Sequence, residues 1–375
     1  MPGDPTPLSL TRKLLAFQTV NPPGGEVDCA RYIGGLLEEG GFSVRYQEWG
    51  EGRVNLVASK EKSGEKKPVC FTGHLDTVPL GNVPWTRDPF SGEVDGDRIY
   101  GRGSSDMKGG VAAMVLAALR LSPILPGRGG LKLVLTAGEE QGCVGAIHLA
   151  GSRYLGEAGA LVVGEPSSNY PVLGHKGAMF LEARTRGVTA HGSMPEQGVN
   201  AIYKAARAVL SLERFDFGGV LHPVLGRPTL NVGTFSAGLN VNSVPDLAVI
   251  GIDIRSVPGQ DHEEIVEKLR TSLGGEVEIE RRIDAESIWT DPRDPWVREV
   301  FEIVTPYLEG PPGERGVSYF TDGSALKPAL GNPPTLILGP GEPSMAHKTD
   351  EFCLLSRIEA AAEIYEEIIR RWCAL

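Results

Sequence analysis

The chain has 375 residues, of which 41% are hydrophobic and 23% are charged, a composition typical of globular proteins that fold in water. Lysine and arginine number 37 against 48 aspartates and glutamates, so the formal net charge is −11. This acidic balance argues against a nucleic-acid binder or a protein of anionic membrane surfaces. No stretch approaches the roughly 18 consecutive apolar residues that a membrane span requires, and the length suggests about two domains.

The cysteines and the N-terminal residues favour a cytoplasmic protein. The five cysteines show no paired spacing and no CxxC motif, which indicates reduced thiols that serve packing. They are Cys29, Cys70, Cys143, Cys353 and Cys373. The first residues, "MPGDPTPLSLTRKLLAF", contain prolines and an early acid where an export signal needs a basic segment and an apolar core.

The first 171 residues alternate between helical and strand patterns. Helices are predicted at 7–20, 26–40 and 108–121, and strands at 42–48, 53–58, 67–73, 131–137 and 159–164. Continuous apolar strands that alternate with helices indicate a largely parallel sheet covered on both faces. The charged stretch 60–67, "KEKSGEKK", is predicted to be a solvated hairpin loop.

A different pattern runs from residue 172 to 286. Its order is β-α-β-β-α-β, with elements near 177–187, 198–213, 228–236, 246–255, 261–273 and 276–283. This order predicts a ferredoxin-like sandwich. The α/β pattern then returns, with helices at 295–308 and 356–372 and a strand at 334–339. We therefore expect one domain formed by 1–171 and 287–375, with a second domain inserted at 172–286.

A histidine and an aspartate stand at the end of the predicted strand 67–73, in "FTGHLDTVP". In an extended segment residues i and i+2 point to the same side, so His74 and Asp76 would face one way. One interpretation is a metal ligand beside the acid that orients it. The other is a polar turn in which Asp76 bonds the local backbone. This stretch alone does not decide between them.

Four further stretches place polar residues at strand ends or in the loops just beyond. They are "YGRGSSDMKGG" with Asp106, "LTAGEEQG" with Glu139 and Glu140, "VVGEPSS" with Glu165, and "LGPGEPSMAHKTDE" with His347. Ligands of open α/β sheets bind at the carboxyl ends of the strands, where such residues converge. Imidazoles and carboxylates suit Zn²⁺ and similar ions, and this number of ligands allows a two-metal site.

Each residue also has a structural interpretation. Asp106 could cap a helix, and Glu139 and Glu140 could form an acidic first helical turn. Glu165 and His347 could be ordinary loop residues. Five independent coincidences are improbable, however, and clustered carboxylates without cations would repel one another. No GxSxG elbow, P-loop, dinucleotide fingerprint or HExxH motif offers a competing chemistry.

These motifs resemble those of the di-zinc family that comprises aminoacylases, acetylornithine deacetylases, succinyl-diaminopimelate desuccinylases and glutamate carboxypeptidases. The matching stretches, in family order, are "GHLDTVP", "DGDRIYGRGSSDMKGG", "TAGEEQG", "GEPSS", "AHGSMPEQGVNAI", "NSVPDLAVIGIDIR" and "GPGEPSMAH". The resemblance implies a zinc-peptidase-like α/β domain, with a mixed sheet sandwiched by helices. It also implies an inserted ferredoxin-like α+β domain that acts as a lid or a dimerisation domain.

The resemblance assigns a role to each strand-end residue. Two divalent ions are implied, Zn²⁺ in the first place and Co²⁺ as an alternative. The ligands would be His74 and Glu165 for one ion, Glu140 and His347 for the other, and Asp106 as the bridge between them. Asp76 would fix the tautomer and the angle of His74. A cis peptide bond between Asp106 and Met107 is also implied.

The remaining functional residues follow from the same resemblance. Glu139 would be the general base. His191 would stabilise the oxyanion from the partner subunit, which implies a homodimer formed through the lid domain. Asn242 and Arg255 match substrate-binding positions, and a guanidinium suits a bidentate grip on a carboxylate. The backbone amides around Gly323, in "FTDGSAL", would bind a carboxylate oxygen.

We therefore expect a cytoplasmic amidohydrolase that cleaves N-acyl amino acids by attack of a metal-bridged hydroxide. The closest match is to the acetylornithine deacetylase and succinyl-diaminopimelate desuccinylase branch. A metallo-carboxypeptidase or dipeptidase of the same family is the alternative, because its scissile bond is the same amide. An inactive binding relative is disfavoured, since all ligands and Glu139 are present. The acyl group and the amino acid stay open.

Overall fold

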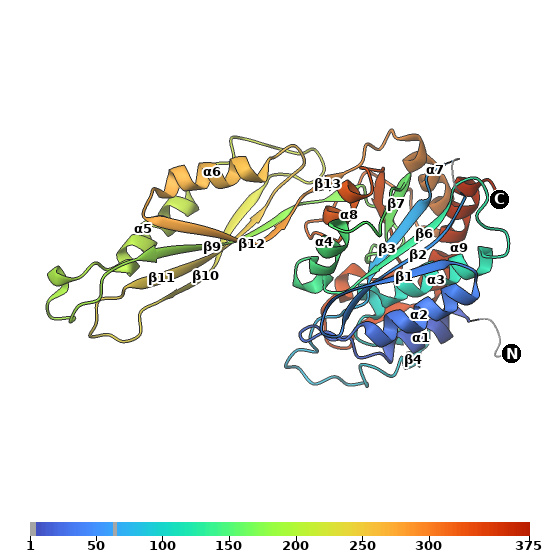
Figure 1. Cartoon of the computed structure of the whole chain (residues 1–375), viewed down its shortest axis with the longest axis horizontal. Coiled ribbons are helices and arrows are strands. Elements are labelled where there is room, and N and C mark those ends of the chain that lie inside the picture. Colours follow the sequence, from blue (N-terminus) through green and yellow to red (C-terminus); the bar gives the residue numbers. More distant parts are fainter. Residues whose placement is uncertain (1–4, 63–65) are drawn as a thin grey trace. The chain divides into compact units, whose positions relative to one another are not determined.

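The computed structural model describes residues 5–62 and 66–375, and the chain divides into two compact units (Figure 1). The first unit contains the residues up to 174, 289–315 and 321–375, and the second contains 175–288 and 316–320. Residues 63–65 of the predicted hairpin loop lie outside the described residues, and Lys60 and Glu61 extend the preceding strand. Among the described residues, no helix has both the length and the apolar character needed to cross a membrane.

A six-stranded mixed sheet forms the centre of the first unit. Its strands, in spatial order, are β1 (Ser43–Gly50), β2 (Arg53–Glu61), β6 (Gly130–Thr136), β3 (Val69–His74), β7 (Ala160–Val163) and β14 (Thr335–Ile337). The last four strands are parallel to one another, whereas β1 and β2 are antiparallel to their neighbours. Every residue of these four parallel strands is buried, as expected for a sheet covered on both faces.

Helices cover this sheet (Figure 1). Five of them contribute to one large apolar core, and α3 lies at its centre between α1, α2 and α9. These five are α1 (Pro7–Leu15), α2 (Val27–Glu39), α3 (Gly109–Leu121), α7 (Pro295–Val304) and α9 (Leu355–Cys373). Two shorter helices, α4 (Val144–Ala150) and α8 (Gly323–Ala329), pack against each other. The prediction of a mixed sheet sandwiched by helices is confirmed.

The second unit has a four-stranded antiparallel sheet in the order β10-β11-β9-β12, which is the strand order of a ferredoxin-like sandwich. Its elements are β9 (Ala178–Arg186), α5 (Ala201–Glu213), β10 (Thr229–Ala237), β11 (Leu247–Arg255), α6 (His262–Leu273) and β12 (Val277–Ala285). Burial alternates along β11 because one face of the sheet packs against the two helices. Phe320, from the segment 316–320, contacts Phe180 of β9 edge to face.

The predicted helix 7–20 is wrong beyond Leu15, where α1 ends. The chain turns at Ala16 and Phe17, and Val20 then pairs with Thr77 in the loop after β3. The amide of Asn21 donates to the carbonyl of Thr77 at 2.7 Å, and the amide of Thr77 donates to the carbonyl of Thr19 at 3.0 Å. Pro22 and Pro23 then follow, with cis bonds at Asn21–Pro22 and Pro22–Pro23. Tertiary pairing with the loop after β3 therefore overrides the local helical pattern.

Several short strands have no counterpart in the predictions. One set forms a small sheet in the order β15-β5-β4, made of β15 (Phe352–Leu354), β5 (Arg98–Tyr100) and β4 (Val94–Asp95). This sheet brings the segment before α3 beside the segment before α9, and these two segments carry Asp106 and His347. The others, β8 (Gly174–His175) and β13 (Ile288–Trp289), pair where the chain passes between the units.

Two aliphatic residues on α4 test its packing. Leu149 is fully buried, whereas Ile147 is 50% exposed. Leu149→Ala should lower the free energy of unfolding by about 2–5 kcal/mol, because it leaves a cavity in a packed region. The matched control Ile147→Ala should lower it by no more than about 1 kcal/mol. Urea denaturation measures both, and equal losses would contradict the position of α4.

Candidate metal centre and active site

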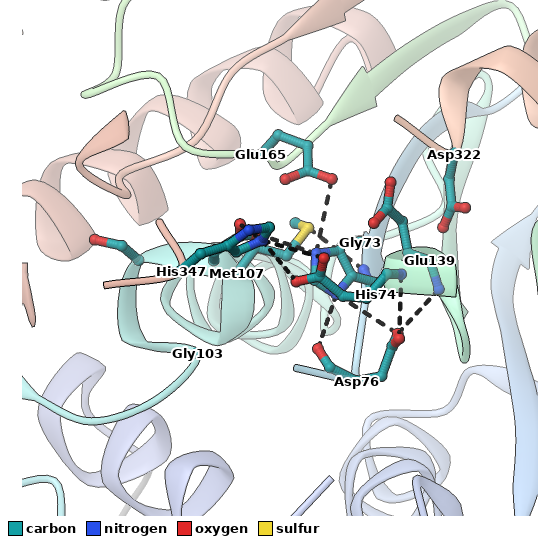
Figure 2. Close-up of polar contacts among 12 residues, drawn as sticks. Gly73, His74, Asp76, Gly103, Met107, Glu139, Glu165, Asp322 and His347 are labelled. Carbon is teal, nitrogen blue, oxygen red and sulfur yellow. Dashed lines mark hydrogen bonds and ion pairs between the residues drawn. The ribbon is translucent and has the colours of Figure 1, made fainter. Parts of the chain in front are cut away.

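The predicted ligands gather at the carboxyl ends of three neighbouring parallel strands (Figure 2). His74 is the last residue of β3, and Glu165 follows β7. Glu140 lies in a short 3-10 turn, η2 (Glu139–Gln141), just after β6. Asp106 lies in the distorted turn η1 (Ser104–Lys108) before α3, and His347 follows the turn η5 (Pro343–Met345).

Asp106 lies between the two histidines. Its Oδ1 is 3.1 Å from His74 Nε2, and its Oδ2 is 3.4 Å from His347 Nε2. His74 Nε2 is also 3.8 Å from Glu165 Oε1, and His347 Nε2 is 3.1 Å from Glu140 Oε2. The donors thus form two groups that share one carboxylate, as in two-metal sites. The peptide bond between Asp106 and Met107 is cis, as expected.

The electrostatics of the cluster fit cations at its centre. Burial is the main reason why the pKa values of Glu140 and Glu165 are raised, and charge repulsion by Asp106 adds to it. Burial alone would raise the pKa of Asp106, but hydrogen bonds from the two histidines outweigh it and lower the pKa. Hydrogen bonds to Asp106 and Glu140 raise the pKa of His347 to about 10. The imidazoles and carboxylates are ligands that Zn²⁺ accepts.

His74 is oriented for coordination through its Nε2. Its Nδ1 lies 2.9 Å from the backbone carbonyl oxygen of Asp76. A carbonyl oxygen only accepts hydrogen bonds, so Nδ1 must donate, and Nε2, which faces Asp106, is the nitrogen that could bind a metal ion in place of its own proton. The carboxylate Oδ1 of Asp76 is farther away, at 3.6 Å. Asp76 therefore contacts the ring most closely through its backbone, whereas we expected its carboxylate to do so.

The carboxylate of Asp76 holds the turn that follows β6. Oδ1 accepts the amides of Gly138 at 2.9 Å and Glu139 at 3.1 Å, and Oδ2 accepts the amide of Glu140 at 3.2 Å. Features of both interpretations of this motif occur in the structure: His74 belongs to the cluster of candidate donors, and Asp76 bonds backbone amides. The bonded backbone, however, is that of a distant turn.

The carboxylate of Glu351 holds the turn that carries Asp106, as Asp76 holds the turn after β6. The sequence analysis did not predict this role of Glu351. Its buried carboxylate accepts the amides of Gly103 at 2.9 Å, Ser105 at 2.8 Å and Asp106 at 3.0 Å. Arg102 Nη1 lies 2.7 Å from its Oε2. A single glutamate four residues after His347 has no pattern that distinguishes it from a surface residue. Its partner Arg102 lies 249 residues earlier in the chain, so the sequence gives no signal that links the two.

Glu139 and Asp322 form a second acidic pair beside the ligands (Figure 2). Burial, with a contribution from Glu165, raises the pKa of Glu139, and burial raises that of Asp322 to about 6. Glu139 Oε1 lies 3.7 Å from Cys143 Sγ, and the hydroxyl of Thr136 donates to Asp322 Oδ2. Asp322 was not predicted, although it stands next to Gly323 in a stretch that was singled out.

The predicted substrate-binding residues are distributed over both units. His191, Asn242 and Arg255 belong to the second unit, and the amide of Gly192 donates to the carbonyl of Asn242 at 2.7 Å. Arg255 makes a bidentate pair with Asp253 at 2.9 and 3.2 Å. Gly323 belongs to the first unit, where its buried amide already donates to Thr321 Oγ1 at 3.1 Å. The roles of these four residues stay predictions.

The fold and the donor set define a metal-dependent amidohydrolase. The family model described as "Peptidase family M20/M25/M40" matches residues 70–371, so the chain belongs to this family. A probable succinyl-diaminopimelate desuccinylase from Staphylococcus epidermidis is 28% identical, and the match covers 97% of each chain. An acetylornithine deacetylase from Proteus mirabilis is 29% identical, over 98% of this chain and 97% of the relative.

Solved structures of the same family share the fold. An M20 family metallo-carboxypeptidase from Sulfolobus solfataricus has a TM-score of 0.82 at 20% identity, over 99% of this chain and 100% of that one. A dinuclear metal-binding M20 peptidase from Bacillus subtilis has a TM-score of 0.73 at 14% identity, over 98% of both chains. The family resemblance inferred from the motifs is confirmed.

Zinc should stabilise the protein after treatment with a chelator. Binding to the native state alone adds about 2.7 kcal/mol when free zinc is about 100 times the Kd. The gain should shrink as the pH falls from 7 to 5, because the carboxylates with raised pKa values then take up protons that compete with the metal. Calorimetry measures the melting temperature. An unchanged melting temperature on zinc addition, or an equal gain in His74→Ala, would contradict the assigned site.

Proposed function

We propose that the protein hydrolyses the amide bond of N-acyl amino acids, as a deacetylase or a desuccinylase. The observation that carries this proposal is Asp106 lying between two groups of ligands, with the buried carboxylate of Glu139 beside them. The names of the two relatives matched over almost the whole chain support this substrate class. In this proposal the first unit is the catalytic domain and the second is the lid.

The ligand roles follow the geometry. His74 and Glu165 would hold one divalent cation, Glu140 and His347 the other, and Asp106 both, with Zn²⁺ proposed and Co²⁺ as the alternative. Such cations polarise the amide carbonyl and make water acidic. Glu139 takes the proton from the attacking water and delivers it to the leaving nitrogen. Burial raises its pKa, which suits a group that must both accept and release a proton near neutral pH.

His191 is proposed to stabilise the oxyanion. Its Nδ1 accepts the backbone amide of Ser193 at 3.1 Å, so the neutral ring carries its proton on Nε2. The side chain is exposed, and an Nε2–H can donate to a developing negative charge. Asn242 and Arg255 are proposed to bind the substrate, with Arg255 facing its carboxylate. The backbone amide of Gly323 stays a proposed contact to a carboxylate oxygen of the substrate. To make this contact, the amide would have to give up its hydrogen bond to Thr321 Oγ1.

The second unit is also proposed to form a homodimer. Its strand β10 is an edge strand, and an unpaired edge can pair with another chain. Large apolar side chains lie exposed on the unit, and such surfaces mark interaction sites. Examples are Leu239, Val241, Tyr203 and Leu210, at 100%, 104%, 67% and 54% exposure. We further propose a cytoplasmic location, because all five cysteines are buried free thiols.

A metallo-carboxypeptidase or dipeptidase activity is the second candidate. An M20 family metallo-carboxypeptidase shares the fold at a TM-score of 0.82, and a peptide bond needs the same ligands and the same base. The two candidates differ only in what lies on each side of the scissile amide.

A hydrolysis panel separates these candidates. Purified protein loaded with zinc or cobalt should hydrolyse acetyl, formyl or succinyl amino acids faster than short dipeptides, as read from the release of free amine.

In the same assay Glu139→Ala should lower kcat by about 10²–10⁴-fold, because general base catalysis contributes that much. Its metal content should equal that of the wild type. Preference for dipeptides would favour the second candidate. Near-normal turnover of Glu139→Ala would show that Glu139 is not the general base.

Mixing two inactive variants tests both the dimer and the role of His191. His191→Ala should lower kcat by about 10²–10³-fold without loss of metal, as the removal of an oxyanion donor does. Its mixture with Glu139→Ala should regain activity, because hybrid dimers contain one site with both residues intact. His222→Ala, also in the second unit, serves as control. A mixture that stays inactive while light scattering shows hybrid dimers would refute a histidine supplied by the partner.

A further inference from the structure

The turn that carries Glu139 and Glu140 is supported by residues from the N-terminal part of the chain, outside the family-matched stretch 70–371. We propose that Asn21 and Arg53 are positioning residues for hydrolysis. Acting through Asp76 and by direct packing, they set the place of the general base and of one metal ligand. This inference rests on the roles proposed above for Glu139 and Glu140.

Asp76 is the centre of this support. Its carboxylate accepts the three consecutive amides of residues 138–140 at 2.9, 3.1 and 3.2 Å. One further donor, Asn21 Nδ2, lies 2.8 Å from Oδ2. The side chains of Asp76 and Asn21 are 0% and 2% exposed, so water does not replace this contact. Asn21 therefore determines how the Asp76 carboxylate is turned toward the amides.

Asn21 is itself fixed from two sides. Its backbone amide donates to the carbonyl of Thr77 at 2.7 Å, which ties it to the loop after β3. Its Oδ1 accepts Arg53 Nη1 at 3.2 Å. Arginine can only donate, so the amide oxygen must face Arg53 and the amide nitrogen must face Asp76. Arg53 thereby decides the orientation in which Asn21 can serve Asp76.

Arg53 also packs directly under the catalytic turn. A Cβ atom on Gly138, the residue before Glu139, would lie 2.7 Å from Arg53 Nη2, and one on Gly24 would lie 2.6 Å from Nε. Both glycines have positive φ angles, +81° and +91°. The guanidinium is thus enclosed between the two backbone segments. Its charge is balanced by the fully buried Glu26, whose Oε2 is 2.9 Å from Nε.

A purely structural explanation of this network is weak. A buried arginine–glutamate pair adds little net stability, because desolvation of both charges offsets their attraction. Apolar residues of similar volume would fill the same space. Apolar residues could not, however, supply a hydrogen-bond donor directed at the Asp76 carboxylate, as Asn21 Nδ2 does. The geometry therefore points to orientation of the turn as the function of the network.

Asn21→Leu tests the inference, because it keeps the volume and removes the donor to Asp76. We expect kcat to fall by about 10- to 100-fold and zinc affinity to fall by a similar factor, as is usual when partners of metal ligands are removed. KM should change by less than about threefold. Zinc affinity is measured by competition with a chromophoric chelator, so it needs no substrate.

The matched control is Thr290→Val, which removes a buried hydroxyl that donates to the carbonyl of Thr335 at 2.6 Å. It should lower the melting temperature but leave kcat and zinc affinity as in the wild type. If Asn21→Leu does not fold, Arg53→Lys is used in its place. This variant keeps the positive charge next to Glu26 but loses the guanidinium N–H that donates to Asn21 Oδ1. Its expected losses in kcat and zinc affinity are intermediate. Wild-type values of both quantities in either folded variant would overturn the inference.

A double-mutant cycle shows whether Asn21 acts through Asp76. In an Asp76→Ala background, Asn21→Leu should cause no further loss of kcat, because the carboxylate that accepts from Asn21 is absent. Additive losses would overturn the proposed route. A wild type that hydrolyses nothing in the panel would refute the proposed function. The zinc measurements on Asn21→Leu would still decide the inference in that case.

Discussion

Two buried carboxylates, each bound by three backbone amides, place the ligands of this site. Asp76 holds the turn of Glu139 and Glu140, and Glu351 holds the turn of Asp106. A carboxylate that accepts several amides is a strong and directional anchor in a buried setting. The ligand-bearing segments are loops, and without such anchors they would be free to adopt several arrangements. The precision of the site therefore depends on residues that are not themselves ligands.

The sheet provides the coarse position of the same residues. β3, β6 and β7 are parallel neighbours, so their carboxyl ends meet at one edge and bring residues 74, 140 and 165 together. The small sheet of β15, β5 and β4 adds the other two proposed ligands, Asp106 and His347, because it joins the segments before α3 and α9. Fold and site are thus built from different interactions: apolar burial sets the sheet, and polar anchoring sets the loops.

This division explains which features the sequence predicted. Apolar periodicity and strand ends are local patterns, so the helices, the sheet class and the five residues proposed as ligands could be named in advance. The end of α1 at Leu15, the anchor Glu351 and the buried Asp322 depend on contacts with distant segments, and a single polar residue carries no periodicity. The same holds for Asp76, where the backbone torsions decide whether its carbonyl or its carboxylate contacts His74.

The insertion of the second unit into the first has a consequence for biosynthesis. Residues 175–288 separate His74, Asp106, Glu140 and Glu165 from His347 along the chain. During translation the ribosome therefore releases four of the five proposed metal-binding side chains more than a hundred residues before the fifth. In the proposed site, complete coordination of both ions would therefore require that the C-terminal segment has emerged and joined the small sheet.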